Sequence, residues 1–378
     1  MPDKIMQSKL NLSKEENLDK YYLGFSNILL NNPLLKAKLF EFFDYDIKRT
    51  FEVDKNDLNN FSEIYDNISI PKNFLAQLNS LDLDNIYNEV INSKVKYLTF
   101  DDENYPENLK NLEDFPLVLY YLGSIENINF NRTIGVVGSR NATESAKQNV
   151  YSLVSNFKNT DLVIVSGLAS GIDSIAHKAS IENDIKTIAV IGSGLDFKYP
   201  AQNKDLYKKI ENGSGVIFSE FPNSIRPIPV NFPQRNRIVT GLSKGVIIAE
   251  AKMKSGAMIS ARYALEQGRE LMCIPGLITN PNCEGIYHLI KNGAGIVTNS
   301  EDVLNLLGWE IQTVKKEKPI LNGIEKLIYE KISSEEISIE GLKQNLDVGI
   351  NELMISLTQM ELSGLIIQKN GLYYTSGN

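Results

Sequence analysis

The sequence predicts a doubly wound α/β domain in the middle of the chain, with a smaller module on either side. From residue 131 to about 308, short β-branched runs end at small residues and are followed by amphipathic segments. Continuous apolar strands indicate a sheet covered on both faces, and strand–helix alternation indicates mostly parallel order. The runs are TIGVVGS (133–139), LVIVSG (162–167), TIAVIGS (187–193), GVIFSE (215–220), GVIIAEA (245–251), ELMCIPG (270–276) and GAGIVTN (293–299). Because ligands of such sheets bind beyond the carboxyl ends of the strands, the Gly and Ser residues there mark the candidate site.

The flanking modules are expected to be small. Residues 1–110 carry short apolar runs at helical spacing, separated by Asn, Asp and Pro, and predict a helical domain. The core is expected to span 111–308, with LVLYYLG in an extended lead-in, and a polar linker follows at 309–319. Residues 320–378 predict three helices and then two strands about Asn370-Gly371, which is the order of a winged helix.

The charge balance limits how this chain could bind nucleic acid. A net charge of −8 over 378 residues argues against a protein that coats duplex DNA by bulk electrostatics, so binding would need a local basic patch. The N-terminus lacks an apolar signal, no apolar run approaches the ~20 residues of a membrane span, and the two cysteines lack zinc-ligand spacing. We expect a cytoplasmic protein with no membrane contact and no bound metal.

The first candidate site follows the first strand of the core, in GVVGSRNATESAK. Asn141 and Glu144 have the spacing of a capping box and predict a helix that starts beside Asn141. Unpaired amides at that helix start, next to Gly138, Ser139 and Arg140, would form an anion site. The segment has neither the dinucleotide-binding glycine pattern nor a P-loop lysine, so a purely structural turn is the alternative.

The second candidate site is the turn SGLASGIDSIAHKA. Asp173 is expected to cap the helix that follows, and His177 lies four residues later on the same face. The two could form an acid–base or metal pair. The alternative is a capping aspartate and a histidine packed against the sheet, because no third ligand or nucleophile lies nearby in the sequence.

Two further turns carry small residues. TIAVIGSGLDFKYP has Gly192 and Gly194 ahead of Tyr199, whose ring could stack on a base or anchor the loop. Ser255-Gly256 precedes a helix and could cradle a phosphate.

The most specific segment is SEFPNSIRPIPVNFPQRNRIVTG, at the carboxyl edge of the sheet. Arg235 and Arg237 stand at the start of a predicted helix and could grip phosphates, while Phe232 could supply a stacking face. Interior or helix-end ion pairs with Glu220 or Glu250 are the alternative for these arginines.

Catalysis finds little support in the sequence. The G-x-S-x-G match GLSKG (241–245) precedes a strand-like run and is no nucleophile elbow, and there is no H-E-x-x-H and no Cys/His pairing that would activate a nucleophile. The candidate carboxylates fall on separate segments without a spacing that defines a pair. Binding without chemistry is therefore expected.

A series of segments, in this order and spacing, resembles the DNA-processing A (Smf) family across about 133–299. The segments are GVVGSR, SGLASGID, AHKA, TIAVIGSGLDFKYP, SEFP, FPQRNRIVTGLS, SGAMISA and GRELMCIPG. The N-terminal part looks like that family's sterile-alpha-motif-like domain, and the tail looks like its winged helix. The resemblance implies an extended Rossmann-like core, a homodimer, single-stranded DNA binding without hydrolysis or cofactor, and loading of the RecA recombinase.

The turns and the resemblance together predict which residues contact single-stranded DNA. They are Gly138, Ser139, Arg140, Ser166, Gly167, Gly171, Ile172, Lys178, Gly192, Gly194, Phe232, Arg235, Asn236, Arg237, Ser255 and Gly256. Residues 285–288 depart from the Gly-Thr-Asn that many members have, close to the helix expected to approach the dimer partner.

Two other functions are weighed. Related Rossmann-like folds serve as nucleotide ribosyl hydrolases, but these carry Pro-Gly-Gly-x-Gly-Thr, and this chain has only Pro275-Gly276. The chain could also be a protein-interaction scaffold whose winged helix binds duplex DNA.

Overall fold

The computed structural model describes residues 17–310, 321, 323–334, 336–346, 348–362, 365–369 and 371–375. The chain divides into two compact units, Met1–Val314 and Lys315–Asn378, and each is described by itself. Most of the linker expected at 309–319 lies outside the described residues. In the part of the chain that the structure describes, no helix is both long and apolar enough to cross a bilayer.

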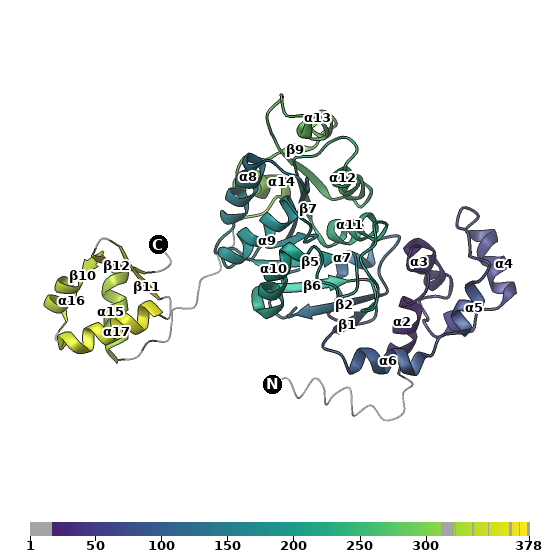
Figure 1. Ribbon diagram of the computed structural model, residues 1–378, viewed down its shortest axis with the longest axis horizontal. Coiled ribbons are helices and arrows are strands. Elements are labelled where there is room, and N and C mark those ends of the chain that lie inside the picture. Colours follow the sequence, from purple (N-terminus) through teal and green to yellow (C-terminus); the bar gives the residue numbers. More distant parts are fainter. Residues whose placement is uncertain are drawn as a thin grey trace. The chain divides into compact units, whose positions relative to one another are not determined.

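The first unit is built around one large sheet, whose strands run in the order β1-β2-β6-β5-β4-β3-β7-β8-β9 (Figure 1). All pairings from β6 through β9 are parallel, whereas β1 and β2 are antiparallel to each other and β2 is antiparallel to β6. The strands are β1 (Lys96–Thr99), β2 (Val118–Gly123), β3 (Thr133–Gly138), β4 (Val163–Ser166), β5 (Lys186–Ile191), β6 (Gly215–Ser219), β7 (Gly245–Ala249), β8 (Glu270–Ile274) and β9 (Gly295–Ile296).

The predicted fold class is confirmed, since each apolar run of the core contains one of the parallel strands. One edge differs from the expectation. Strand β1 lies within the range expected to be wholly helical, and the lead-in to the core is strand β2. A strand of four residues at the end of a sheet has too short a pattern to be recognised from sequence.

Helices cover both faces of the sheet, as Figure 1 shows. One face packs against α8 (Glu144–Ser155), α9 (Ile172–Glu182) and α14 (Ser300–Leu307). The other packs against α11 (Asn231–Leu242) and α12 (Gly256–Glu266). Successive residues of β4, β7 and β8 alternate between these two cores, which is why these strands read as continuous apolar runs. Shorter helices α10 (Lys204–Lys209) and α13 (Glu284–Lys291) follow β5 and β8.

The winding of the chain reverses beside β3. From β3 the chain moves through β4 and β5 to β6, then returns through α11 to β7 on the other side of β3. A Cβ on Gly138, at the end of β3, would lie 1.9 Å from the carbonyl oxygen of Ala249 in β7, so only glycine fits there. The carboxyl ends of β3 and β7 form the switch point at which ligands of such sheets bind.

The N-terminal helices pack on the core of the same unit. The buried hydroxyl groups of Ser26 and Tyr120 lie 2.6 Å apart, and the Gln234 side chain donates to the Leu30 carbonyl over 2.8 Å. These bonds join the helical segment to β2 and α11. The helices are α2 (Asp19–Ser26), α3 (Pro33–Phe42), α4 (Lys55–Ile64), α5 (Phe74–Asn79), α6 (Leu83–Ile91) and α7 (Glu107–Lys110).

The second unit has its own hydrophobic core. Its elements are α15 (Gly323–Ser334), β10 (Ile337–Ser338), α16 (Ile339–Asn345), α17 (Ile350–Leu362), β11 (Ile366–Lys369) and β12 (Leu372–Thr375). The three helices and the β11–β12 pair agree with the predicted order, and β10 adds a short strand against β12. Gly371 has a φ of +80°, as a tight hairpin turn requires, while Asn370 lies outside the described residues. The winged-helix assignment stays a prediction.

Candidate functional site

A pocket of about 680 Å³ opens at the switch point of the sheet. Its walls come from the turn after β3, the start of α11 and the segment between β7 and α12. It brings together these predicted site residues: Gly138, Ser139, Arg140, Phe232, Arg235, Asn236, Ser255 and Gly256. It also includes Val137, Asn141, Ala169, Asp173, Tyr199, Pro229, Pro233, Lys252, Ala257, Ile259 and Asn282. We call it the switch-point pocket.

The rim of the switch-point pocket carries an exposed arginine held over an aromatic ring. The guanidinium carbon of Arg140 lies 5.2 Å from the centroid of the Phe232 ring. The Tyr199 ring lies 5.6 Å from the same ring, and half of Tyr199 is exposed. Both aromatic rings line the open pocket, and whether Tyr199 stacks on a ligand or anchors its loop stays a prediction.

The helix that follows β3 starts later in the chain than predicted. Helix α8 begins at Glu144, and its N-cap is Thr143, whose hydroxyl accepts from the Ala146 amide over 3.2 Å. The predicted capping box of Asn141 with Glu144 is therefore wrong. Thr143 is a cap-forming residue two positions further on, and Asn141 lines the pocket instead.

Arg235 lies at the floor of the pocket and is only 3% exposed. Its Nη1 donates to the carbonyl oxygens of Gly167 and Val190. A Cβ on Gly167 would lie within 2.6 Å of the guanidinium, so glycine is required for Arg235 to enter. Burial lowers the pKa of Arg235 to about 10, which leaves it charged at neutral pH. Its buried Nε has no hydrogen-bond partner among the described residues.

Asp173 lies beside Arg235 in the pocket and is only 6% exposed. Its Oδ2 accepts from the amide of Ala169 over 3.4 Å. Burial raises the pKa of Asp173 above its ordinary value, and the guanidinium of Arg235 acts in the opposite direction. The expected N-cap role is wrong, because α9 begins at Ile172 with Gly171 as its N-cap. Gly171 has a φ of +78°, a conformation that favours glycine.

His177 is fully buried and does not pair with Asp173. Its Nδ1 lies 2.8 Å from the Thr187 hydroxyl, which itself donates to the Ile164 carbonyl, so Nδ1 carries the proton. Burial lowers the pKa of His177 to about 3, and the ring is neutral at physiological pH. His177 therefore packs against the sheet, which was the alternative to an acid–base or metal pair with Asp173. Among the described residues, no cluster of three His, Cys, Asp or Glu side chains could hold a metal.

Arg237 does not reach the pocket. It has 0% exposure, its Nη2 donates to Glu220 over 2.6 Å, and its Nε lies 3.0 Å from Asp114. Burial alone would lower the pKa of Arg237, but Glu220 and Asp114 outweigh it and the pKa is raised. The expectation that Arg237 grips phosphate is thus corrected in favour of the ion pair with Glu220. Residues two apart on a helix point about 200° away from each other, so Arg235 and Arg237 cannot share one site.

The remaining predicted site residues lie outside the pocket lining. They are Ser166, Gly167, Gly171, Ile172, Lys178, Gly192 and Gly194. Most of them shape the turns. The Ser166 hydroxyl donates to the Val136 carbonyl, and a Cβ on Gly194 would lie 2.1 Å from the Asn223 carbonyl oxygen. Lys178 differs, because it is exposed on α9 and lies 3.9 Å from Glu182.

Glu250 is a feature that sequence analysis left as an open alternative. It follows β7 with a φ of +55° and is 3% exposed. Its carboxylate accepts from the Thr143 amide (2.7 Å) and from the side chains of Asn280 (3.1 Å) and Asn282 (2.9 Å). Burial acts to raise its pKa, but these hydrogen bonds outweigh it and the pKa of Glu250 is lowered. Glu250 thereby joins the start of α8 to the loop after β8 and holds Asn282 at the pocket.

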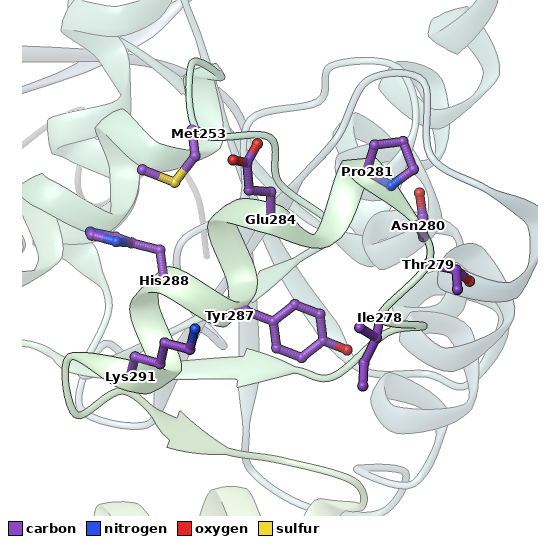
Figure 2. A pocket seen from close by; sticks show the side chains of 9 residues that line it. All are labelled: Met253, Ile278, Thr279, Asn280, Pro281, Glu284, Tyr287, His288 and Lys291. Carbon is purple, nitrogen blue, oxygen red and sulfur yellow. The ribbon is translucent and has the colours of Figure 1, made fainter.

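A second surface lies at the far end of the sheet, around α13 (Figure 2). A depression of about 590 Å³ is lined by Met253, Ile278, Thr279, Asn280, Pro281, Glu284, Tyr287, His288 and Lys291. Two adjacent apolar side chains are exposed here: Ile278 is 87% exposed and Leu277 71%. We call this the α13 surface.

Comparisons with known proteins agree on one family. The family model described as DNA recombination-mediator protein A matches residues 96–308. The DNA processing protein DprA of Streptococcus pneumoniae is 44% identical over 203 residues, which cover 54% of this chain and 71% of that protein. Protein Smf of Escherichia coli is 40% identical over 207 residues, and the match spans 55% of each chain, about half the length of that relative.

Two solved structures share the fold. The X-ray structure of DprA from Streptococcus pneumoniae has a TM-score of 0.65 at 36% identity, over 79% of this chain and 100% of that one. A structure of DNA processing protein A from Helicobacter pylori, described for its single-stranded DNA binding mode, has a TM-score of 0.51 at 31% identity. That match covers 56% of this chain and 95% of the other.

The buried ion pair of Arg237 with Glu220 and Asp114 is expected to matter for stability. Arg237→Met leaves Glu220 and Asp114 without their cation, so we expect the free energy of unfolding to fall by about 3–5 kcal/mol in urea titrations. Adding Glu220→Gln should recover part of the loss. The control is Arg262→Met, whose pair with Glu266 is exposed and should contribute less than about 1 kcal/mol. Equal losses in the two single variants would contradict the assignment.

The buried histidine makes a prediction about pH. His177 has a pKa of about 3 when folded and near 6.5 when unfolded, so between these values the unfolded chain binds the extra proton. Stability is therefore present above pH 6.5 and is lost as the pH falls toward 3. We expect His177→Gln to remove a slope that approaches about 1.4 kcal/mol per pH unit, measured by urea unfolding between about pH 5 and 7. Exposed His288, the only other histidine of the sequence, supplies the control: His288→Gln should keep the slope.

Proposed function

The chain belongs to the DNA recombination-mediator protein A family, and from this premise we propose that its switch-point pocket binds single-stranded DNA without cleaving it. The observation that carries the proposal is the exposed guanidinium of Arg140, held against the Phe232 ring beside Tyr199. Proteins that bind single strands combine cations for the phosphates with aromatic rings for the bases. The related Helicobacter pylori protein is described for its single-stranded DNA binding mode, which supports the same function here.

Local charge supports the proposal even though the chain is acidic overall. Arg140 and Lys252 are exposed at the pocket, and the buried guanidinium of Arg235 adds positive charge behind them. The start of α12 at Gly256 also lines the pocket, and the amides of a helix start favour an anion. Phosphates would therefore bind along the rim formed by Arg140, Lys252 and Gly256.

The biological role that follows is delivery of the bound strand to a recombinase. We propose that the protein loads RecA onto single-stranded DNA in the cytoplasm, during transformation or recombination. The family description as a recombination mediator supports this role. The experiment is RecA assembly on DNA coated with single-strand-binding protein, followed by ATP hydrolysis. A shorter lag in the presence of this protein is expected, and an unchanged lag would count against loading.

The proposal includes no catalysis, and no cofactor is expected. Neutral, buried His177 offers no general base to the pocket. The alternative is a nucleotide ribosyl hydrolase, and release of free base from nucleoside monophosphates by the purified protein would favour it. The scaffold alternative would gain support if removal of 320–378 abolished all DNA binding and the remaining core bound none.

We further propose that the α13 surface pairs two copies of the chain. Ile278 and Leu277 are largely exposed there, and the edge strand β9 leaves one side of the sheet without a neighbour among the described residues. Clustered exposed apolar side chains are typical of protein interfaces. A symmetric contact would cover this patch on both copies at once.

For DNA binding, we expect Arg140→Ala to weaken oligothymidylate affinity by about tenfold, since a charge-assisted hydrogen bond to phosphate is lost. In a salt series, the slope of log affinity against log salt should also become shallower by about 0.7. Fluorescence anisotropy with a labelled oligonucleotide and its duplex measures both. Arg262→Ala is the matched control, because Arg262 is exposed but outside the pocket lining. An unchanged slope in Arg140→Ala would argue against a phosphate contact.

For self-association, we expect Ile278→Glu to convert a dimer to a monomer, because each copy would place a carboxylate in the apolar contact. Sedimentation equilibrium gives the masses. Ile64→Glu is the control, since Ile64 is an equally apolar side chain with 65% exposure on helix α4. A wild-type protein that is monomeric at micromolar concentration would exclude the proposed pairing.

A further inference from the structure

The floor of the switch-point pocket carries opposite charges on two buried side chains. Asp173 is 6% exposed and Arg235 3%, and both line the cavity. They come from different elements, α9 and α11, and no ion pair within 4.0 Å joins them. Each therefore keeps hydrogen-bonding capacity: both carbonyl contacts of Arg235 use its Nη1, and its buried Nε has no partner among the described residues. The Asp173 carboxylate accepts from the Ala169 amide over 3.4 Å and from the backbone of Gly167, and its two oxygens can accept further hydrogen bonds.

These two charges divide the pocket by the chemistry that each end accepts. A phosphate carries only acceptor oxygens and negative charge, so the Asp173 carboxylate repels it. The rim with Arg140 and Lys252 suits phosphate, and both of these side chains are exposed. The group that reaches the floor must therefore bring N–H donors to Asp173 and an acceptor to Arg235. A DNA strand can satisfy both requirements only by turning the edge of a base inward.

The four bases differ in how well they match this floor. Guanine presents two adjacent donors, N1–H and the N2 amino group, next to the acceptor O6. A carboxylate has two oxygens that accept such a pair, and a guanidinium donates to O6. Thymine has a single donor between two acceptors, whereas adenine and cytosine each offer one amino group. We propose that the switch-point pocket is a base-reading subsite that prefers guanine, with Asp173 accepting from its Watson–Crick edge.

This inference rests on the proposed binding of single-stranded DNA and adds a base preference to it. The pocket of about 680 Å³ has room for a base between its aromatic rim and its floor. Phe232 and Tyr199, with ring centroids 5.6 Å apart, provide apolar surface for the base. Asp173 and Arg235 then act as specificity residues, while the rim supplies most of the affinity.

The test compares short oligothymidylates that differ at one central position, which carries dG, deoxyinosine, dA, dC or dT. Deoxyinosine retains N1–H and O6 but lacks the N2 amino group, so it isolates a single hydrogen bond. We expect wild-type protein to bind the dG strand about tenfold more tightly than the deoxyinosine or dT strand. This comparison needs no variant, so a folding defect cannot obscure it. Equal affinity for all five strands would overturn the inference and leave single-strand binding intact.

Variants then assign the preference to the floor. Asp173→Asn should reduce the dG-to-deoxyinosine affinity ratio toward one, because the carboxamide loses one acceptor oxygen. Asp205→Asn, an exposed aspartate on α10, is the matched control and should keep the wild-type ratio. A ratio that persists in Asp173→Asn would overturn the role of this carboxylate. Wild-type protein that binds none of the strands would remove the proposed function itself, which is a different result from binding without preference.

Discussion

The ion pair of buried Arg237 with Glu220 and Asp114 holds the helix on which the pocket depends. It attaches α11 to the end of β6 and to the segment ahead of β2. Lys36 of the N-terminal helices interacts electrostatically with Glu220 and Arg237. Burial lowers the pKa of Lys36 to about 8, while Glu220 favours its charged form. Buried ion pairs add little net stability compared with apolar packing, but they strongly disfavour arrangements in which one charge is left alone.

Because α11 is held from one side, its opposite side faces the pocket with a defined orientation. The guanidinium of Arg235 lies beneath the turn at Gly167. A side chain at position 167 would occupy the space that the guanidinium fills, so this position requires glycine. Phe232, one turn earlier, reaches the rim and meets Arg140 from the turn after β3. A stacking face, an exposed cation and a buried cation thus come from a single helix and a single turn. The arrangement of the pocket therefore depends on an ion pair whose residues lie outside the pocket lining.

Much of the fold could be predicted from sequence because parallel strands buried on both faces leave continuous apolar runs that end at small residues. Strand β1 could not, since four residues at a sheet edge carry almost no pattern. Helix starts were the other error. The segment Asn141 to Thr143 and the segment Gly171 to Asp173 each offer two residues that can cap a helix. Tertiary contacts decide between them: the Thr143 amide is held by Glu250, which lies 107 residues further along the chain.

Position after a strand was enough to predict that Ser139 and Arg140 lie at the carboxyl edge of the sheet, where they line the pocket. The sequence could not show which arginine reaches the pocket, because Arg235 and Arg237 are both cations at the start of one predicted helix. Only the packing of α11 separates one that lines a pocket from one that closes an ion pair. Nothing in the sequence indicated that Asn282 lines the pocket. It belongs to a loop after β8 that is held at the pocket by the hydrogen bond of Asn282 to Glu250. Asp173 was predicted to cap α9, but Gly171 is the N-cap and Asp173 lines the pocket.

Glu250 joins two separate surfaces of the first unit. Through Asn282 it reaches the switch-point pocket, and through Asn280 it reaches the α13 surface. One carboxylate therefore sets the position of the loop for both. In a genetic screen, a substitution at this position would disturb both surfaces at once, although Glu250 is absent from the lining of either. Alleles that disturb one surface alone must be sought on either side of it.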